Sequence, residues 1–400
     1  MDLHYAPVML GLMRVSNRLP ASLLPTAFSK LVEARRNTAG FLDLTGSNPT
    51  SCGFDFGSEE WRHALSSPEV LQYEADPCGS LAARTAIAAH HGHGVLPQDI
   101  LLTASTSEAY SWLFKLLCDP GDQVLVPSPS YPLFEHLASL EGIRAVDVAA
   151  YFHERWCLDI SALESAFGPR TKAIVVVNPN NPSGQYLSRI EWRDLTTLCA
   201  RHDLSLLVDE VFADFALEPA EDPMRTALMD PEPPCPVFIL SGLSKVSLLP
   251  QLKLGWILLR GRARAYLDPL AFLADQYLSV SASAQASAAS ALQAAPARRK
   301  LVLQRAGENL ACLDGLLKEH PHLSRLPVEG GWSVILRRPV LHGADDQACS
   351  ARLLEETSTL VHPGSFFDLP SEGYLVLSLL SPPEIFREGL SRILPRLPVD

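Results

Sequence analysis

The chain has 400 residues, of which 47% are hydrophobic and 20% charged, and its mean hydropathy is +0.09. This composition supports a large buried core and excludes a disordered tail or a coiled coil. Its 33 Lys and Arg against 45 Asp and Glu give a net charge of -12, which argues against a basic face for nucleic acid and against binding to an anionic membrane surface. The length admits two or three domains, or one large enzyme domain with a smaller partner.

The N-terminal residues, which begin Met1-Asp2-Leu3-His4, lack the positively charged and apolar regions of a secretory signal. The Ala- and Ser-rich stretch 278–297 is too weakly hydrophobic to predict a membrane helix. Eight cysteines are spread along the chain without a CxxC pair or a metal-ligand spacing, and we expect them to be reduced. We therefore expect a cytoplasmic protein without a metal site.

Helical and strand patterns alternate along the first two thirds of the chain. Helical patterns occupy four stretches, residues 79–93, 107–117, 132–140 and 188–202. Short apolar runs, typical of strands buried on both faces, lie at residues 174–177, 206–208 and 237–240. Ser188 and Glu191 have the spacing of a capping box at the start of the last helix. The alternation predicts an α/β fold, with a mostly parallel central sheet flanked by helices.

The C-terminal part of the chain has a different pattern. A Pro-rich stretch, 218–236, predicts an exposed loop, and a long helical region, 262–318, carries the chain into a smaller C-terminal domain. That domain is predicted to contain a strand at 332–336, a helix at 347–356, a strand at 374–380 and a helix from Pro383. Strands and helices that are mixed in this way predict a smaller α+β domain.

Polar residues follow several predicted strands, and ligands of open α/β sheets bind outside the carboxyl ends of the strands. The stretch 101–108 leads from a strand into a helix whose first turn can bind a phosphate, although capping by Ser105 alone also explains it. The turn 178–184, Asn-Pro-Asn-Asn-Pro-Ser-Gly, is by itself only a fixed loop.

Two charged residues end apolar runs. Asp209 follows one strand, and a buried carboxylate without a partner is costly, which indicates a ligand. Lys245 follows another, in Ser241-Gly242-Leu243-Ser244-Lys245. Lysines in such places are usually exposed, but a desolvated lysine amine can have a depressed pKa and attack a carbonyl carbon.

The order and combination of these four motifs resemble the class I/II aminotransferases of pyridoxal-phosphate fold type I, from about Phe41 to Ile393. The resemblance implies a large cofactor-binding domain, 45–290, and a small domain formed by residues 1–44 and 291–400. It implies pyridoxal 5'-phosphate as the cofactor.

The resemblance assigns roles to individual residues. Lys245 would form the Schiff base with the cofactor and then move the α-proton of the substrate. Asp209 would pair with the pyridinium nitrogen, Asn181 would hydrogen-bond the phenolic oxygen and contact the substrate, and Tyr131 would stack on the ring. An aromatic residue in a turn is the alternative interpretation of Tyr131.

The resemblance also assigns the phosphate contacts. Thr106 and Ser107 would hold the phosphate, joined by Ser241 and Lys253, and Lys253 stands where family members usually have an Arg. Tyr73 resembles the tyrosine that reaches the phosphate of the neighbouring subunit, which implies a homodimer with shared sites.

Three further positions depart from the family pattern. Phe212 stands where many relatives have a Tyr, and Ser47 stands about where a Gly approaches the substrate carboxylate. Val376 occupies the position of an Arg that clamps the α-carboxylate, and an apolar side chain cannot form that bidentate pair. Either Arg337 or Arg338 replaces it, or the amine substrate has no α-carboxylate in the usual place.

The resemblance therefore implies an aminotransferase (EC 2.6.1.-) that moves an amino group from an amino acid or amine to an oxo acid. A lyase that eliminates a β-substituent such as a thiol, or a decarboxylase, uses the same fold and cofactor and is the alternative. A non-enzymatic binding module is disfavoured because Lys245 is present. His90-His91-Gly92-His93 is interpreted as a solvated helix end rather than a metal site.

Overall fold

The computed structural model describes residues 16–20, 24–54, 66, 68–71, 73–340 and 345–397. In this part of the chain, strands from the first two thirds form one large sheet of seven strands. In spatial order they are β2 (Ile100–Thr103), β10 (Gly255–Arg260), β9 (Val237–Gly242), β8 (Ser205–Asp209), β7 (Thr171–Val177), β3 (Gln123–Ser128) and β4 (Arg144–Ala149). Only β10 runs antiparallel to its neighbours within this sheet, so the predicted mostly parallel sheet is confirmed.

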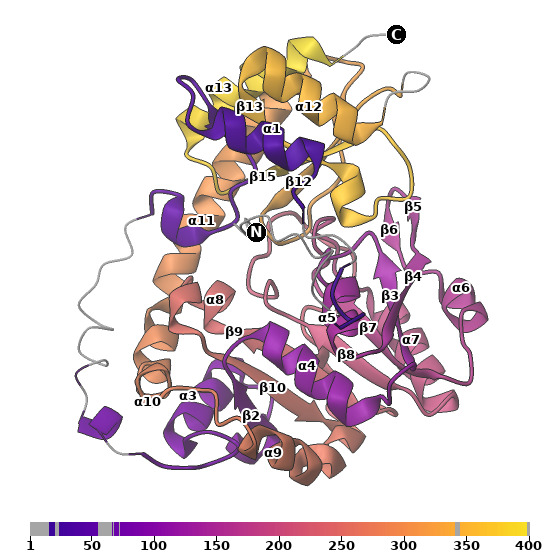
Figure 1. Cartoon of the computed structure of the whole chain (residues 1–400), viewed down its shortest axis with the longest axis vertical. Helices are drawn as coiled ribbons and strands as arrows, with labels where there is room; N and C mark the ends of the chain where they lie inside the picture. The colour runs from indigo at the N-terminus through magenta and orange to yellow at the C-terminus, as the bar shows by residue number, and fades with distance from the viewer. Residues whose placement is uncertain are drawn as a thin grey trace.

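Helices cover both faces of the large sheet (Figure 1). One face, here called the α3 face, packs against α3 (Leu81–His91), α6 (Ile160–Ser165), α7 (Arg189–Arg201), α10 (Ala282–Ala286) and the first part of α11 (Ala288–Leu317). The other face, here called the α4 face, packs against α4 (Thr106–Leu117), α5 (Phe134–Leu140) and α9 (Leu267–Asp275). Alternate residues of a strand point to opposite faces, so Ile239 packs on the α3 face and Leu240 on the α4 face.

A smaller antiparallel sheet is formed by the C-terminal part of the chain. Its four strands lie in the order β11 (Ser324–Arg325), β12 (Ser333–Arg337), β15 (Tyr374–Ser378) and β14 (His362–Pro363). The second part of α11, with α12 (Asp346–Thr357) and α13 (Pro383–Ile393), packs on one face of this sheet. The predicted mixture of C-terminal strands and helices is confirmed.

The N-terminal segment joins this smaller unit, as the upper part of Figure 1 shows. Helix α1 (Ala27–Arg36) packs against α12, and β1 (Leu42–Asp43) pairs with β13 (Thr359–Leu360). The remaining short elements are the hairpin β5 (Tyr151–His153) and β6 (Arg155–Cys157), helix α8 (Leu243–Val246), and the 3-10 helices η2 (Pro49–Ser51), η3 (Pro68–Leu71), η4 (Pro97–Asp99), η5 (Ala227–Met229), η6 (Pro250–Leu252), η7 (Gly261–Tyr266), η8 (Gly364–Phe367) and η9 (Leu394–Arg396). No described helix is long and apolar enough to cross a membrane.

Local chemistry explains the helix starts that position the site. Ser188 accepts a hydrogen bond from the backbone N–H of Glu191, and the Glu191 carboxylate accepts one in return from the Ser188 N–H, so the predicted capping box is confirmed. At α4 the pattern differs: Ser105 caps the Glu108 N–H, but the Glu108 carboxylate accepts from the Ala104 N–H.

Two expectations about the central part of the chain are wrong in part. The predicted helical region 262–318 is interrupted after α9, because Ser281 caps a separate helix, α10. The predicted exposed loop 218–236 contains η5, whose Ala227 and Leu228 are buried. The Pro content marks a segment without regular strands or long helices, but it does not decide burial.

Candidate active site

The predicted site residues lie at the carboxyl ends of the central strands. Asp209 ends β8, Lys245 lies on α8 directly after β9, and Asn181 follows β7. Tyr131 follows β3, and Thr106 begins α4 after β2. These ends meet at one edge of the sheet, which brings together residues that are far apart in sequence.

Asp209 is a buried carboxylate on the α4 face. One of its oxygens accepts a hydrogen bond from the Tyr110 hydroxyl at 3.0 Å, and the other accepts from the Val211 N–H at 3.1 Å. Burial raises the pKa of Asp209 to about 6, although these two hydrogen bonds and the Lys245 ammonium oppose the rise. A buried carboxylate with only two donors favours a further cationic partner.

Lys245 places its amine among aromatic rings. The Nζ atom lies 4.8 Å from the centre of the Trp332 ring and 5.6 Å from that of Phe212. Burial lowers the pKa of Lys245 to about 8, while Asp209 and Cys52 act in the opposite direction. Near neutral pH the charged form therefore still predominates, but the neutral form that a nucleophile or proton acceptor requires is far more populated than for an ordinary lysine.

The start of α4 has the geometry of an anion site. Its first residues, Thr106 and Ser107, are half-buried, and their N–H groups have no acceptor among the described residues. Gly255 lets β10 approach this turn, because a Cβ at Gly255 would come within 3.0 Å of the Ser105 carbonyl carbon. Lys253 lies two residues before Gly255, is exposed, and has no carboxylate partner in the described chain. Free N–H groups and a nearby cation suit a phosphate.

Ser241 is the predicted phosphate residue that the fold separates from this turn. It is paired with Trp256 on β10, and strand alternation places it with Ile239 on the α3 face. The start of α4 lies on the opposite face. The Ser241 hydroxyl is fully buried and has no hydrogen-bond partner among the described residues. The prediction of Ser241 as a phosphate ligand does not agree with this arrangement.

The Asn-Pro turn after β7 contains three asparagines, which make different contacts. Asn178 donates to the Met224 carbonyl and accepts from the Leu187 N–H, and Asn180 donates to the Pro129 carbonyl. Asn181 is half-buried, and its side chain makes no hydrogen bond within the described residues. The first two therefore hold the turn, and Asn181 is the member available to a ligand.

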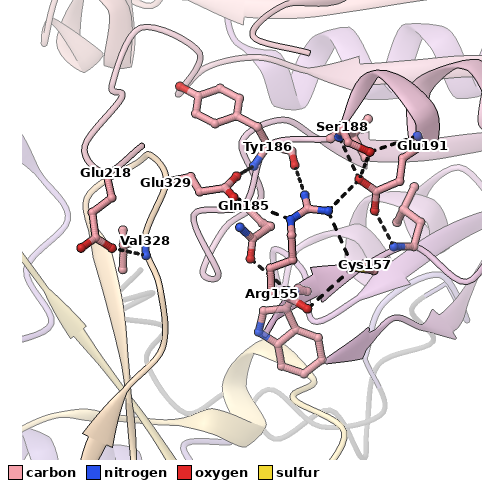
Figure 2. Close-up of polar contacts among 12 residues, drawn as sticks. Arg155, Cys157, Gln185, Tyr186, Ser188, Glu191, Glu218, Val328 and Glu329 are labelled. Carbon is pink, nitrogen blue, oxygen red and sulfur yellow. Dashed lines mark hydrogen bonds and ion pairs between the residues drawn. The ribbon is translucent and has the colours of Figure 1, made fainter. Parts of the chain in front are cut away.

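A network of partly buried charges supports the same turn from the other side (Figure 2). The Arg155 guanidinium of β6 lies 3.0 Å from the Glu191 carboxylate and 3.6 Å from that of Glu329, and it donates to the Tyr186 carbonyl. Glu329 in turn accepts from the Tyr186 N–H at 2.9 Å. The chain that follows Asn181 is thus fastened both to the hairpin and to the segment that leads into the small sheet.

Tyr131 lies close to the Asp209 carboxylate. It is half-buried, its ring makes an edge contact with Phe134 at 6.0 Å, and burial together with the Asp209 charge raises the pKa of its hydroxyl. Tyr73, in contrast, is 81% exposed within its own chain. Its side chain is free to contact another molecule.

The substrate side of the site is largely apolar. Val376 is buried in a cluster with Trp156 and Ile335, on the face of the small sheet opposite its helices. Arg338 is fully buried and paired with Asp346 at 2.6 Å, so its charge is already neutralised. Arg337 is exposed at the end of β12.

The loop that carries Ser47 is anchored to the small sheet. Ser378 donates its N–H to the Leu44 carbonyl at 2.7 Å and its hydroxyl to the Gly46 carbonyl. Ser47 itself is exposed. Cys52, from the same loop, is buried, and burial raises the pKa of its thiol, although the Arg305 guanidinium and the Lys245 amine oppose the rise.

The predicted solvated helix end at His90–His93 is wrong for one residue. The Trp256 indole N–H donates to His91 Nε2 at 3.0 Å, and burial lowers the pKa of His91 to about 3. His90 lies 3.5 Å from the Asp214 carboxylate. The described residues contain no group of three ligands suited to a metal ion.

The sequence did not identify Tyr110 or Trp332 as site residues. The only signal for Tyr110 is its place one helical turn after Thr106, on the buried side of α4. Trp332 follows a turn in the small domain and meets Lys245 only when the two sheets are assembled. Neither contact has a local pattern.

The residues present fit pyridoxal phosphate. The turn at Thr106 and Ser107, with Lys253, would hold the phosphate, and Asp209 would pair with the pyridinium nitrogen. Lys245 provides an amine of lowered pKa for the aldehyde. The close approach allowed by Gly255 and the free N–H groups of α4 are features of this chain that such a ligand explains.

Comparison with known proteins gives a consistent result. The family model for aminotransferases of class I and II matches residues 54–393. An alanine aminotransferase of Mycobacterium tuberculosis is 30% identical over 354 residues, which are 85% of this chain and 81% of the relative. The structure of alanine aminotransferase from Pyrococcus furiosus is 25% identical with a TM-score of 0.83, and the match covers 96% of this chain and 99% of that one. Aspartate aminotransferase from Thermus thermophilus with maleate is 26% identical with a TM-score of 0.80, over 96% and 100% of the two chains.

Proposed function

The chain belongs to the class I and II aminotransferases, and we propose from this premise how its own residues perform the transfer. It is a pyridoxal-phosphate-dependent enzyme that moves an amino group to an oxo acid. When bound, the cofactor supplies an aldehyde carbon and an electron-withdrawing ring. The observation that carries the assignment of residues is the pair of the buried Asp209 and the half-buried Lys245 at one sheet edge.

Lys245 is the catalytic residue in this proposal. Its amine would hold the cofactor covalently, and its Nζ atom would take up or give up one proton. The lowered pKa of about 8 keeps both forms of the amine accessible near neutral pH. The Phe212 and Trp332 rings exclude water around the amine and stabilise its charged form.

Other residues orient the cofactor. Asp209 would pair with the pyridine nitrogen of the cofactor and favour its protonated form. The Tyr110 hydroxyl fixes the rotation of the Asp209 carboxylate. Thr106, Ser107 and Lys253 bind the phosphate, with Lys253 acting as a point charge. Asn181 would donate to the phenolic oxygen, and Tyr131 would stack on the ring. Ser241 is left out of this set because it points to the α3 face.

The amino donor is bound without an arginine at position 376. Val376 is uncharged and lies in an apolar cluster. The Arg338 guanidinium is paired with Asp346, so it is not free to bind a carboxylate. Ser47 and Asn181 remain as polar groups for the substrate. We infer that the panel of donors should include amines without an α-carboxylate as well as amino acids.

The oligomer we propose is a homodimer in which Tyr73 reaches the phosphate of the neighbouring site. Large apolar side chains are exposed on the same region, where α10 packs against η3 and α3; they are Leu71, Tyr73 and Leu81. Exposed apolar residues that cluster in this way mark protein interfaces. Sedimentation velocity of the purified protein tests the dimer.

Two assignments complete the proposal. The large domain comprises residues 45–290, and the small domain residues 1–44 and 291–400. The protein acts in the cytoplasm, which agrees with the eight cysteines being free thiols in the structure.

An absorbance spectrum of the cofactor-loaded protein tests the function. Amino acids and simple amines are added one at a time, and the spectrum is recorded before and after each addition. We expect one donor to convert the bound cofactor to its pyridoxamine form, which absorbs at shorter wavelength, and an oxo acid to reverse the change. Release of ammonia or carbon dioxide without the pyridoxamine form would contradict the proposal.

A further inference from the structure

A second cavity lies on the α3 face, on the other side of the sheet from the cofactor residues. Its volume is about 150 Å³, and His91, Glu210, Asp214, Arg225, Thr226 and Ser241 are among the residues that line it. A cavity of this volume accommodates about six non-hydrogen atoms. The proposed function does not use any of these side chains.

Three hydrogen-bond donors lie in this lining, and two of them are buried without an acceptor within the described residues. The Ser241 hydroxyl belongs to a residue that is only 1% exposed, and it has no partner. The Arg225 Nη1 atom is buried and likewise unpartnered. Leaving such groups without an acceptor costs free energy, so their convergence on one cavity indicates a missing acceptor.

The third donor follows from the chemistry of a hydrogen bond. An indole N–H can only donate, so His91 Nε2 must accept from Trp256 and cannot carry a proton in that contact. A neutral imidazole then carries its proton on Nδ1, which makes it a donor. Burial lowers the pKa of His91 to about 3, which agrees with the neutral ring.

The acidic residues of the lining do not supply the missing acceptor. The Glu210 carboxyl already binds the Thr226 hydroxyl at 2.6 Å and the Ala227 N–H, and burial raises its pKa to about 8. The Asp214 carboxylate is paired with Arg299 and lies 3.5 Å from His90. The Arg225 guanidinium instead lies 4.7 Å from the centre of the Tyr186 ring, a contact that does not neutralise its charge.

We propose that this cavity binds a small carboxylate, held by the Arg225 guanidinium, the Ser241 hydroxyl and the His91 Nδ1–H. One positive charge and two neutral donors match a monovalent oxyanion, and the volume limits the ligand to a short carboxylic acid. Val246, from the helix that carries Lys245, also lines the cavity. A bound carboxylate would thus contact α8, which carries Lys245, from the α3 face, without contacting the cofactor.

Fluorine NMR of fluoroacetate with the cofactor-loaded protein tests this site directly. Loading fills the phosphate-binding turn of α4, so that an anion cannot bind there. We expect saturable broadening of the fluoroacetate signal and its reversal by acetate. Ser241→Ala should weaken binding about tenfold, and Arg225→Gln should weaken it more, because a charge-assisted hydrogen bond is lost.

Two controls keep the test decisive. Arg189→Gln removes an exposed arginine that is paired with Asp222, and this variant should bind fluoroacetate as the parent does. Thermal unfolding of each variant shows whether it is folded. Fluoroacetate binding that persists in both Ser241→Ala and Arg225→Gln would place the anion at the substrate site, and absence of binding in the parent would leave only water in the cavity. Either result overturns the proposal.

Discussion

Asp209 and Glu210 are neighbours in the chain, yet their side chains leave the end of β8 toward opposite faces of the large sheet. Asp209 accepts from Tyr110 of α4, whereas Glu210 accepts from Thr226 and Ala227 on the other side. Both carboxyls are buried, and burial raises both pKa values, to about 6 for Asp209 and about 8 for Glu210. At neutral pH the first is therefore mostly charged and the second mostly neutral.

The difference lies in what each carboxyl still lacks. Asp209 has the Lys245 ammonium nearby and accepts only two hydrogen bonds, so it can take a further cation. Glu210 accepts hydrogen bonds from the Thr226 hydroxyl and the Ala227 N–H, and these bonds hold the 226–228 segment in place. At this edge of the sheet, the α4 face carries the catalytic residues and is here called the chemical face. The α3 face has a structural role and, in our proposal, binds a small anion.

The largest effect should come from removing the Lys245 amine on the chemical face. Lys245→Ala should reduce transamination by about 10⁴-fold, because both covalent attachment and proton transfer are lost. The measurement is pyridoxamine formation with a saturating amino donor. Lys300→Ala, which removes an exposed lysine on α11, is the matched control and should keep the parent rate.

Borohydride treatment identifies the lysine that carries the cofactor. The parent should gain the mass of the reduced cofactor on a peptide that contains Lys245, and Lys245→Ala should gain none. If the variant also acquires the mass, another lysine carries the cofactor and the assignment of Lys245 is wrong.

Replacing the charged member of the carboxyl pair should have the next largest effect. Asp209→Asn should lower kcat/KM by about 10² to 10³, since a buried charge opposite the pyridinium is lost. As the pH falls through about 6, Asp209 becomes protonated, so cofactor binding to the parent should weaken toward that of the variant. The ratio of the two dissociation constants cancels the titration of the cofactor itself. A ratio that stays constant from pH 5 to 8 would contradict the proposed ion pair.

The elements around this edge could be predicted because their signals are local. Apolar runs marked the strands, and the Ser188 and Glu191 spacing marked the start of α7. The convergence of Asp209 and Lys245 followed from the rule that parallel strands end at one edge. Such inferences need only the order of the strands.

Contacts between distant segments could not be predicted in this way. The Tyr110 hydroxyl meets Asp209 only through the packing of α4 on β8, and Arg155 meets Glu329 only when the small sheet is in place. The prediction that Ser241 binds the phosphate disagrees with the structure for a related reason. The motif shows that it ends a strand, but only the observed packing shows that α4 covers the opposite face.

The structural member of the carboxyl pair should affect stability rather than catalysis. Because the folded pKa of Glu210, about 8, lies above the unfolded value of 4.5, its protonated form stabilises the fold at low pH, and this contribution is lost as the pH rises through about 8. The amide that replaces the carboxyl in Glu210→Gln cannot ionise, and it keeps a donor and an acceptor. Relative to the parent, the variant should therefore gain about 3 kcal/mol in unfolding free energy between about pH 6 and 9.

Urea denaturation at the two pH values measures this change, and transamination at pH 7 should stay within about threefold of the parent. A large loss of activity with unchanged pH dependence of stability would mean that Glu210 belongs to the chemical face, and the comparison between the two carboxyls would fail.

The smallest effect concerns the cation beside the α4 turn. Lys253 is exposed, so water screens its charge, and Lys253→Gln should weaken cofactor binding only about tenfold. Lys253→Arg should restore or exceed the parent affinity, because a guanidinium can bind two phosphate oxygens at once. Lys172→Gln is the matched control, since Lys172 pairs with Asp122 at the opposite end of the sheet and should leave affinity unchanged. Equal affinities for all three variants would show that the free N–H groups of Thr106 and Ser107 hold the phosphate without help from a side-chain cation.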